Sequence, residues 1–541
     1  MTVSYGSALI DLSTRDSRAA LRGVEAVDAH GGREPLSVFW SRSLFSAGGM
    51  VAGGLLSLVT GVVFARWLTP GGFGTYSLVL ISMAVAGGIG TFGFDNCTAR
   101  FAALYLGNGE TYRIRGLIRH GIARALLFSS VIGIGLFALL RAGILERTRL
   151  AQVTHFSMLL LVGIPLYALQ LVLLQAVLGL QGVRTRILLE KIVQPVCRLA
   201  LPFALLAWLA EPTAAAVYSL LATSLVLDVA NALLLSHKLR GLPAISATNP
   251  EEKRQWLRYA LPFVFYSIQN FFWAGMGLDV FLVGAMTSMR DAGIYAAALR
   301  LVPILALARG AMDYSFGPRV GVLFGQSDLK AIGKLYRNTS TLALAWTLPV
   351  AVILAVFGRT IMRSFFGGGY EAGGMALAFL AAGFVVDSAT GCNTTLLSMA
   401  GRSGLVLLNG VTGGTTLLFL AWVLIPRWGI AGAGFATACS MSVVNSMATL
   451  EIWETYRLSP FGRTPIKLLG VGLGVAAFGV LWRIAVLPLI GPGTASLAVS
   501  ASVIVFAYLV LVLAVTGSFR ALFIAEDGQA TCQGPHVSSG F

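Results

Sequence analysis

The sequence predicts an all-α fold that crosses a membrane about fourteen times. Of its 541 residues, 56% are hydrophobic and only 11% are charged, whereas about 25% of the residues in soluble domains are charged. A soluble protein of this length could not remove so much apolar surface from water. The chain also has 63 glycines, and glycine is more frequent in membrane helices than in soluble ones. These observations indicate a polytopic membrane protein.

The apolar segments have the length that a bilayer requires. They are about 20–27 residues long, and about 20 helical residues span a hydrocarbon core of about 30 Å. The predicted spans of the first half are 40–65, 74–98, 119–140, 153–178, 187–210 and 214–236. Those of the second half are 260–286, 292–316, 338–358, 373–398, 404–426 and 430–453, and two more follow at 467–488 and 494–517.

The distribution of basic residues predicts the orientation of these spans. Loops that follow even-numbered spans carry more than twice as many Lys and Arg as loops that follow odd-numbered spans. By the positive-inside rule, the more basic loops face the cytoplasm, and so do both termini. The polar stretches 1–38 and 518–541 are expected to be a disordered cytoplasmic lead-in and tail.

The composition argues against nucleic-acid binding and against catalysis. The chain has 39 Lys and Arg against 23 Asp and Glu, a net charge of +16. These charged residues are scattered between apolar segments and form no basic domain. The five cysteines include no CxxC pair, and the five histidines have no metal-ligand spacing. Walker A, GxSxG and HExxH patterns are absent from the sequence. We therefore expect no enzymatic activity, no metal, no cofactor and no nucleic-acid partner.

An internal repeat relates the two halves of the chain. An offset of 219 residues aligns FARWLTPGGFGTYSL at 64–78 with VGAMTSMRDAGIYAA at 283–297, so that Gly74 falls on Gly293. The same offset also aligns Tyr76 with Tyr295, Arg100 with Arg319 and Gly182 with Gly401. Because each repeat holds six spans, an even number, both copies enter the bilayer in the same sense. This predicts two parallel lobes, at 39–240 and 255–460, with a substrate site at mid-membrane, and two extra helices within 465–517.

Charged residues inside the predicted spans are the candidate functional residues. A charge at the centre of a spanning helix costs at least about 2.5–3.5 kcal/mol, so function or pairing is expected to account for it. The candidates are Asp95, Arg124, Arg198, Asp228, Asp279, Arg300, Arg309, Asp313 and Asp387. Arg124 lies close enough to the cytoplasm for its side chain to reach the interface, and the sequence gives Asp387 no partner.

The eighth predicted span holds three of these charges. Arg309 and Asp313 are four residues apart, so they share a helix face and can pair. Arg300 and Arg309 lie on roughly opposite faces of a straight helix, but Pro303 between them can bend it. One interpretation is that an arginine binds a phosphate through its two-pronged guanidinium group. The alternative is internal ion pairing that only holds the helix in its bundle.

The other charges are open to similar alternatives. Asp279 either binds a proton or cation or neutralises a neighbouring arginine. Arg198 and Asp228 lie on consecutive antiparallel spans, which favours a structural ion pair. Asp95, near the inner end of the second span, is either functional or hydrated.

Two motifs resemble a transporter family. The first span is followed by ARWLTP at 65–70 and then by Gly74, Tyr76 and Leu78. The seventh and eighth spans carry Asp279, Val283, Gly284, Gly293, Tyr295, Ala298, Arg300 and Leu301. Together with GIAGAGFATACS at 429–440, these residues resemble the polysaccharide transporter branch of the multidrug/oligosaccharidyl-lipid/polysaccharide exporter superfamily. The resemblance covers about 40–460, and the two extra spans agree with longer members of the family.

The resemblance implies a flippase for lipid-linked oligosaccharides in the bacterial inner membrane, serving exopolysaccharide, capsule or O-antigen assembly. Polysaccharide polymerases and glycosyltransferases are its candidate partners, beside membrane lipid. In the family, spans 1, 2, 7 and 8 line a central cavity, and the matching residues here are Arg42, Asp95, Asp279, Arg300 and Arg309. In peptidoglycan-precursor relatives, the two extra spans form a groove for the lipid tail. Family members often have a basic residue after this aspartate, whereas Val280 follows Asp279 here.

A mechanism follows as a hypothesis. The diphosphate of a polyprenyl-pyrophosphate oligosaccharide binds cavity arginines while its lipid stays in the bilayer, and rocking of the lobes then exposes the head group outside. A multidrug extruder of the same superfamily is the main alternative. A major facilitator carrier usually has a sequence like GxLaDRxGRR in the loop after its second span. Here that loop reads RFAALYLGNGETYRIRG, which disfavours such a carrier. A polysaccharide polymerase is disfavoured because no predicted outer loop is long.

Overall fold

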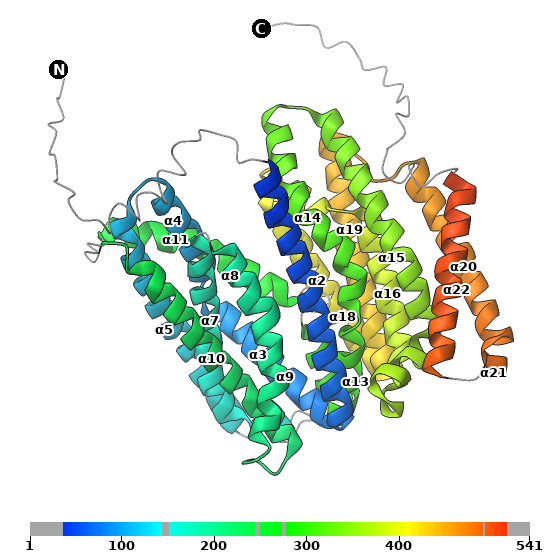
Figure 1. The fold of residues 1–541 in the computed structure, drawn as a ribbon, viewed down its shortest axis with the longest axis horizontal. Coiled ribbons are helices and arrows are strands. Elements are labelled where there is room, and N and C mark those ends of the chain that lie inside the picture. The colour runs from blue at the N-terminus through cyan, green and yellow to red at the C-terminus, as the bar shows by residue number, and fades with distance from the viewer. Residues whose placement is uncertain are drawn as a thin grey trace, which may run out of the picture. The chain divides into compact units, whose positions relative to one another are not determined.

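The computed structural model describes residues 36–142, 151–180, 182–243, 249–272, 277–490 and 493–516. Every regular element in these ranges is a helix (Figure 1), which confirms the all-α prediction. The chain divides into two compact units. Unit 1 contains the residues up to Val63 and Thr75–Ile268, and unit 2 contains Phe64–Gly74 and the chain from Gln269 onward.

The helices of unit 1 come mainly from the first half of the chain. They are most of α2 (Leu36–Trp67), most of α3 (Pro70–Gly90), α4 (Phe94–Gly107), η1 (Thr111–Arg113), α5 (Ile114–Arg141), α6 (Ala151–Thr154), α7 (Ser157–Gly179), α8 (Val183–Ile187), the π-helical η2 (Leu188–Val193), α9 (Gln194–Leu205), α10 (Pro212–Leu239) and most of α11 (Pro250–Phe272).

Unit 2 holds the second half of the chain. Its helices are α12 (Leu278–Met286), α13 (Met289–Leu299), α14 (Val302–Gly325), α15 (Leu329–Phe366), η3 (Gly368–Tyr370), α16 (Gly373–Thr390), α17 (Asn393–Met399), α18 (Ser403–Trp428), α19 (Ile430–Tyr456), α20 (Arg463–Ala485), α21 (Leu487–Ile490) and α22 (Thr494–Thr516). Helices α20 and α22 pack against each other and against α15. The Tyr508 hydroxyl of α22 donates to the carbonyl of Ala345 in α15 at 3.0 Å.

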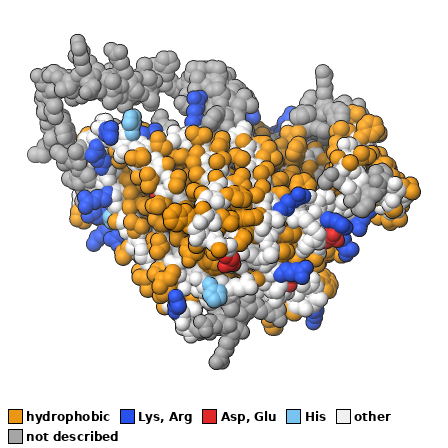
Figure 2. Space-filling view, turned by 60° about the horizontal axis from the view of Figure 1, so that its bottom comes forward, with side chains coloured by type: hydrophobic (Ala, Val, Ile, Leu, Met, Phe, Trp, Pro, Cys, Tyr) orange, Lys and Arg blue, Asp and Glu red, His pale blue; other side chains and the backbone are white. Residues whose placement is uncertain are grey.

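The helices have the length and hydrophobicity of membrane spans. Among the described residues, ten helices are long and apolar enough to cross a bilayer, or eleven if the bent pair α13–α14 is one span. Large hydrophobic side chains are exposed on them; Leu473, for example, is 75% exposed. On the face that Figure 2 shows, hydrophobic side chains predominate and charged ones are few. The chain is therefore a multi-pass membrane protein.

Several predicted spans are interrupted rather than continuous. The second span breaks between α3 and α4, where Phe92 and Gly93 have φ angles of 51° and 74°. Gly93 is required there because a Cβ atom would lie 2.1 Å from the Ala260 carbonyl oxygen. The eighth span bends by 41° between α13 and α14. Pro303 lies in the first turn of α14, so the predicted bend at this proline is confirmed.

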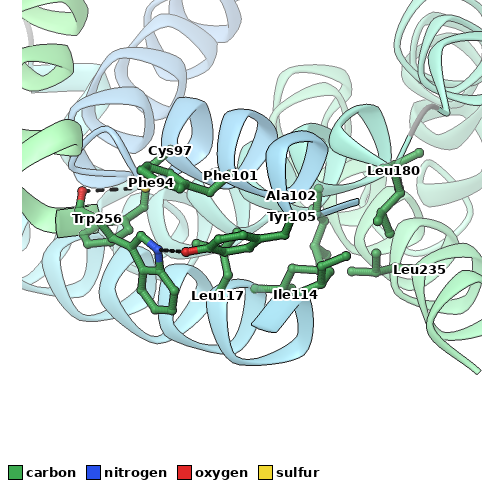
Figure 3. Close-up of a cluster of buried hydrophobic side chains, with 14 of the residues drawn as sticks. Phe94, Cys97, Phe101, Ala102, Tyr105, Ile114, Leu117, Leu180, Leu235 and Trp256 are labelled. Atoms are coloured by element: carbon green, nitrogen blue, oxygen red, sulfur yellow. Dashed lines mark hydrogen bonds between the residues drawn. The ribbon is translucent and has the colours of Figure 1, made fainter. Parts of the chain in front are cut away.

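The first half of α11 belongs to the core of unit 1. Trp256 is completely buried among side chains of α4, α5, α7 and α10 (Figure 3). Its indole Nε1–H donates to the Tyr105 hydroxyl at 3.0 Å, and its carbonyl oxygen accepts a bond from the Cys97 thiol at 3.6 Å. The compact units therefore divide at Ile268, about one helix later than the predicted lobe boundary between 240 and 255. The predicted tails, 1–38 and 518–541, lie outside the described residues except for 36–38, which are helical.

Residues 64–74 are bound firmly within unit 2. The Arg66 Nε–H donates to the Phe365 carbonyl at 2.7 Å, and the Tyr370 hydroxyl donates to the Ala65 carbonyl at 2.9 Å. Burial raises the pKa of the Tyr370 hydroxyl above its ordinary value, so this donor keeps its proton.

Two glycines bring the backbones of α3 and α13 together. A Cβ atom on Gly74 would lie 2.1 Å from the Met289 carbonyl oxygen, and one on Gly293 would lie 1.9 Å from the Pro70 carbonyl oxygen. Only hydrogen fits at both positions. The contact is reciprocal, because Met289 and Gly293 occupy the same places in α13 as Pro70 and Gly74 occupy in α3.

Candidate functional site

The centre of unit 2 holds a buried ion pair. Arg309 of α14 and Asp387 of α16 contact each other through the Arg309 Nη1 atom, which lies 2.5 Å from Oδ1 and 2.6 Å from Oδ2. The two side chains are only 14% and 2% exposed. No partner for Asp387 could be predicted from the sequence, because 78 residues separate it from Arg309 and only tertiary packing of α14 against α16 brings them together.

Asparagines and threonines extend this pair into a network. The Asn445 amide of α19 donates to Asp387 Oδ1 at 3.0 Å. The Asn445 side-chain oxygen in turn accepts hydrogen bonds from Thr390 at 3.2 Å and from Asn393 at 3.0 Å. Buried polar groups in an apolar medium need such partners. The network joins α14, α16, α17 and α19 around one arginine.

Asp313 is a weaker partner of Arg309 than the sequence suggested. Its Oδ2 atom lies 4.0 Å from Arg309 Nε, and its Oδ1 atom accepts a hydrogen bond from Thr395 at 2.9 Å. The Arg309 Nε atom has no hydrogen-bond partner among the described residues. The predicted i,i+4 ion pair is therefore present but long, and one edge of the guanidinium remains able to donate.

Asp279 lies in a second buried cluster of unit 2. It is 1% exposed, and its Oδ2 atom accepts a hydrogen bond from the Tyr295 hydroxyl at 3.0 Å. That hydroxyl also lies 3.1 Å from Thr437 Oγ1. Asp279 and Tyr295 both belong to the motif that resembles the transporter family, and the structure brings their side chains into contact.

The remaining predicted cavity residues differ in burial and in their contacts. Arg300 is half-buried at the bend between α13 and α14. Asp95 is half-buried in the first turn of α4. Its carboxylate accepts hydrogen bonds from Thr91 and Asn96, both at 3.1 Å. Arg42 lies on α2, but its side chain is outside the described residues.

The predicted ion pair between Arg198 and Asp228 is not formed. Asp228 is 5% exposed, yet neither of its carboxylate oxygens has a hydrogen-bond partner among the described residues, and the same holds for Arg198 Nε. Arg198 lies on α9 and Asp228 on α10. Antiparallel neighbours place two residues at similar depth, but the sequence does not fix the direction in which each side chain points. Arg124 is exposed on α5, as a side chain reaching the interface would be.

The residues that the sequence did not single out are uncharged. Asn393, Asn445 and Thr437 complete the two networks, and Asn393 and Asn445 are fully buried. Two asparagines inside apolar helices were the available signal, because a buried amide in a membrane helix is normally hydrogen-bonded across helices. Together the two networks hold one arginine, three carboxylates and two amides in unit 2.

Comparison with known proteins gives a consistent fold and family. Residues 39–308 match the family of polysaccharide biosynthesis proteins. No curated protein sequence matches the chain significantly.

Solved structures of transporters share the fold at low identity. The lipid II flippase MurJ in an inward closed conformation is 13% identical, with a TM-score of 0.63 over 87% of this chain and 98% of its own. An inward-facing multidrug resistance MATE family transporter of the MOP superfamily is 15% identical, with a TM-score of 0.61 over 75% and 94% of the two chains. A MOP superfamily transporter from Pyrococcus furiosus is 15% identical, with a TM-score of 0.53 over 77% and 94%.

Proposed function

Because the chain belongs to the family of polysaccharide biosynthesis proteins, we propose that it is a flippase for a polyprenyl-pyrophosphate-linked oligosaccharide. It acts in the bacterial inner membrane, with both termini in the cytoplasm, and supplies exopolysaccharide, capsule or O-antigen assembly. Polymerases and glycosyltransferases of the same assembly process are its proposed partners. The fold shared with a lipid II flippase, whose substrate is also lipid-linked, supports this function over an enzymatic one.

The proposed architecture has fourteen spans arranged as two parallel six-span repeats and a C-terminal pair. The reciprocal contact of Gly74 and Gly293 supports it, because these residues are equivalent at the offset of 219. The bent pair α13–α14 supports it as well, because these two helices count as a candidate span only when they are taken together.

The observation that carries the proposal is the arginine at the centre of unit 2. Arg309 is held within apolar helices by Asp387, and its Nε edge has no hydrogen-bond partner among the described residues. A diphosphate offers two adjacent anionic oxygens that match a guanidinium group. In the proposed mechanism, the diphosphate replaces Asp387 or adds to the free edge of Arg309, and Arg300 binds the second phosphate.

The other predicted cavity residues keep their proposed roles. Arg42 and Asp95 contact the sugar or diphosphate during passage, and Asp279 sets the position of Tyr295. The membrane potential, negative inside, favours outward movement of an anion by about 2.3 kcal/mol per charge per 100 mV. The two units must rearrange for the head group to change sides.

A flipping assay in reconstituted vesicles tests the proposal. Arg300→Ala and Arg309→Lys are each expected to reduce flipping of a polyprenyl-pyrophosphate oligosaccharide at least about tenfold, because lysine keeps the charge of Arg309 but loses its two-pronged donor geometry. Arg319→Ala removes an exposed charge from the same helix, α14, and is the matched control with normal flipping. Normal flipping by both Arg300→Ala and Arg309→Lys would remove these residues from the site.

A multidrug extruder is the second candidate function. The fold shared with MATE transporters supports it. Drug susceptibility of a deletion strain distinguishes the two: a flippase mutant loses surface polysaccharide with unchanged drug tolerance, whereas an extruder mutant becomes drug-sensitive and keeps its polysaccharide.

A further inference from the structure

The first three turns of α11 carry a basic face that no part of the proposed transport mechanism uses. Lys253, Arg254 and Arg258 are exposed, and none of them forms an ion pair among the described residues. By contrast, the neighbouring Glu252 is paired with Arg113 at 3.1 Å. Three cations on two consecutive turns therefore lack a counterion within the described part of the chain.

The basic face of α11 also carries exposed hydrophobic side chains, which lie between its cations. At about 100° per residue, Lys253 and Arg258 bound an exposed arc of about 140°. Leu257 and Leu261 lie inside this arc and are 42% and 47% exposed. Glu251 lies at the edge of the arc, and it forms no ion pair with Arg254 among the described contacts.

The opposite side of the same helix is fixed to unit 1. Trp256 is completely buried and bonded to Tyr105, and the ring of Tyr259 lies 4.6 Å from the Arg100 guanidinium carbon. These contacts hold the rotation of α11, so its basic arc is permanently directed away from the unit. Because the helix is already ordered, a ligand that binds this arc does not have to offset the conformational entropy lost when a helix forms.

We propose that this arc binds the anionic head groups of membrane phospholipids in the leaflet that the basic loops face. Lys and Arg at the end of a membrane helix bind lipid phosphates, and leucines between them enter the upper acyl region. The alternation of Leu257 and Leu261 with cations fits a lipid, which has both a phosphate and chains. A soluble phosphate would use the cations alone. The leaflet follows from the charge bias of the loops, and the proposal is independent of the transported substrate.

Thermal unfolding of the full-length protein in detergent, titrated with short-chain lipids, tests the proposal. Phosphatidylglycerol is expected to raise the Tm at lower concentrations than phosphatidylcholine of the same chain length, because a ligand of the native state stabilises it. The triple variant K253Q/R254Q/R258Q should have the wild-type Tm without lipid, since these side chains are exposed. It should need at least about tenfold more phosphatidylglycerol for the same shift, since each basic side chain near an anionic surface contributes to binding.

Two further variants separate the sources of the effect. R290Q/R359Q/R427Q removes three exposed arginines that form no ion pair among the described residues, from the loops after odd-numbered spans, and should respond to phosphatidylglycerol as wild type does. L257S/L261S should weaken the response to phosphatidylglycerol but leave any response to inorganic phosphate unchanged.

The outcomes decide between the occupants. Equal loss of response in both triple variants would mean general charge attraction and would overturn the proposed site. Inorganic phosphate that reproduces the whole shift would overturn the lipid assignment in favour of a soluble anion, as would a wild-type response in L257S/L261S.

Discussion

At the scale of single residues, Asp387 and Asp228 form a natural contrast. Both are carboxylates buried in apolar helices, at 1% and 5% exposure. Asp387 contacts Arg309 and Asn445, whereas Asp228 has no hydrogen-bond partner among the described residues. A buried charge without a partner is costly, and a paired one becomes costly only when its partner is removed.

Asp387→Asn is expected to destabilise the protein. The change leaves Arg309 with only the long contact to Asp313, and breaking a buried pair in this way costs about 3 kcal/mol. The measurement is the free energy of unfolding or the Tm in detergent. Arg363→Gln is the control, because Arg363 pairs with Glu371 at 61% and 42% exposure and an exposed pair contributes about 1 kcal/mol or less. An equal loss in both variants would contradict the structural assignment.

Asp228→Asn is expected to leave the Tm unchanged or to raise it. Asparagine has the same shape without the charge, so the cost of burying an unpaired carboxylate disappears. The same unfolding measurement checks this, with Asp387→Asn as the opposite case. A fall in Tm as large as that of Asp387→Asn would show that Asp228 has a partner. A loss of flipping with a normal Tm would identify Asp228 as a transport residue.

At the scale of elements, helix contacts in this protein depend on glycine at specific positions. Gly74→Ala and Gly293→Ala are each expected to destabilise unit 2 by about 1–3 kcal/mol, since the new methyl group would overlap a carbonyl oxygen and force a backbone shift. Gly71→Ala in the same turn of α3 is the control, because a Cβ atom there would meet nothing within 4 Å. Thermal unfolding of the three variants measures the difference. Similar Tm values for all three would contradict the close contact.

The contact of α11 with unit 1 gives a second prediction at this scale. Trp256→Phe removes the indole donor to Tyr105 and part of a completely buried ring. We expect a loss of about 1–2 kcal/mol, from one hydrogen bond and reduced packing. Tyr105→Phe removes only the hydroxyl and should cost less. Unfolding free energies of the two single variants and the double variant test this. Strictly additive losses would contradict a direct bond between the two side chains.

At the scale of the whole molecule, the sequence predicted composition-dependent features well and side-chain pairing poorly. The helical class, the membrane character and the bend at Pro303 follow from composition and from local backbone chemistry. The partner of Asp387 does not, because it comes from a helix 78 residues away. The Arg198–Asp228 pair failed for the same reason, since depth in the membrane was predictable but the direction of each side chain was not. The break at Gly93 was also missed, because the close approach that leaves no room for a Cβ atom there comes from the Ala260 carbonyl of a helix far away in the sequence.

The unit boundary shows the same limit on a larger scale. Hydropathy placed the seventh span at 260–286 and the lobe boundary in the polar loop before it. The structure assigns α11 to unit 1 because Trp256 fills a site in that core. A single tryptophan near Lys and Arg residues gives no hydropathy signal. Only the packing of its side chain shows which compact unit contains α11. The proposed fourteen-span, two-repeat architecture remains a prediction.

The reciprocal glycine contact also gives the crossing of α3 and α13 a local symmetry. Contact between residues i and j, matched by contact between j and i, is the pattern of two identical subunits related by a two-fold axis. Here both partners belong to one polypeptide, and each glycine excludes a side chain that would overlap a backbone carbonyl of the other helix. A substitution at either glycine therefore disturbs both sides of the crossing.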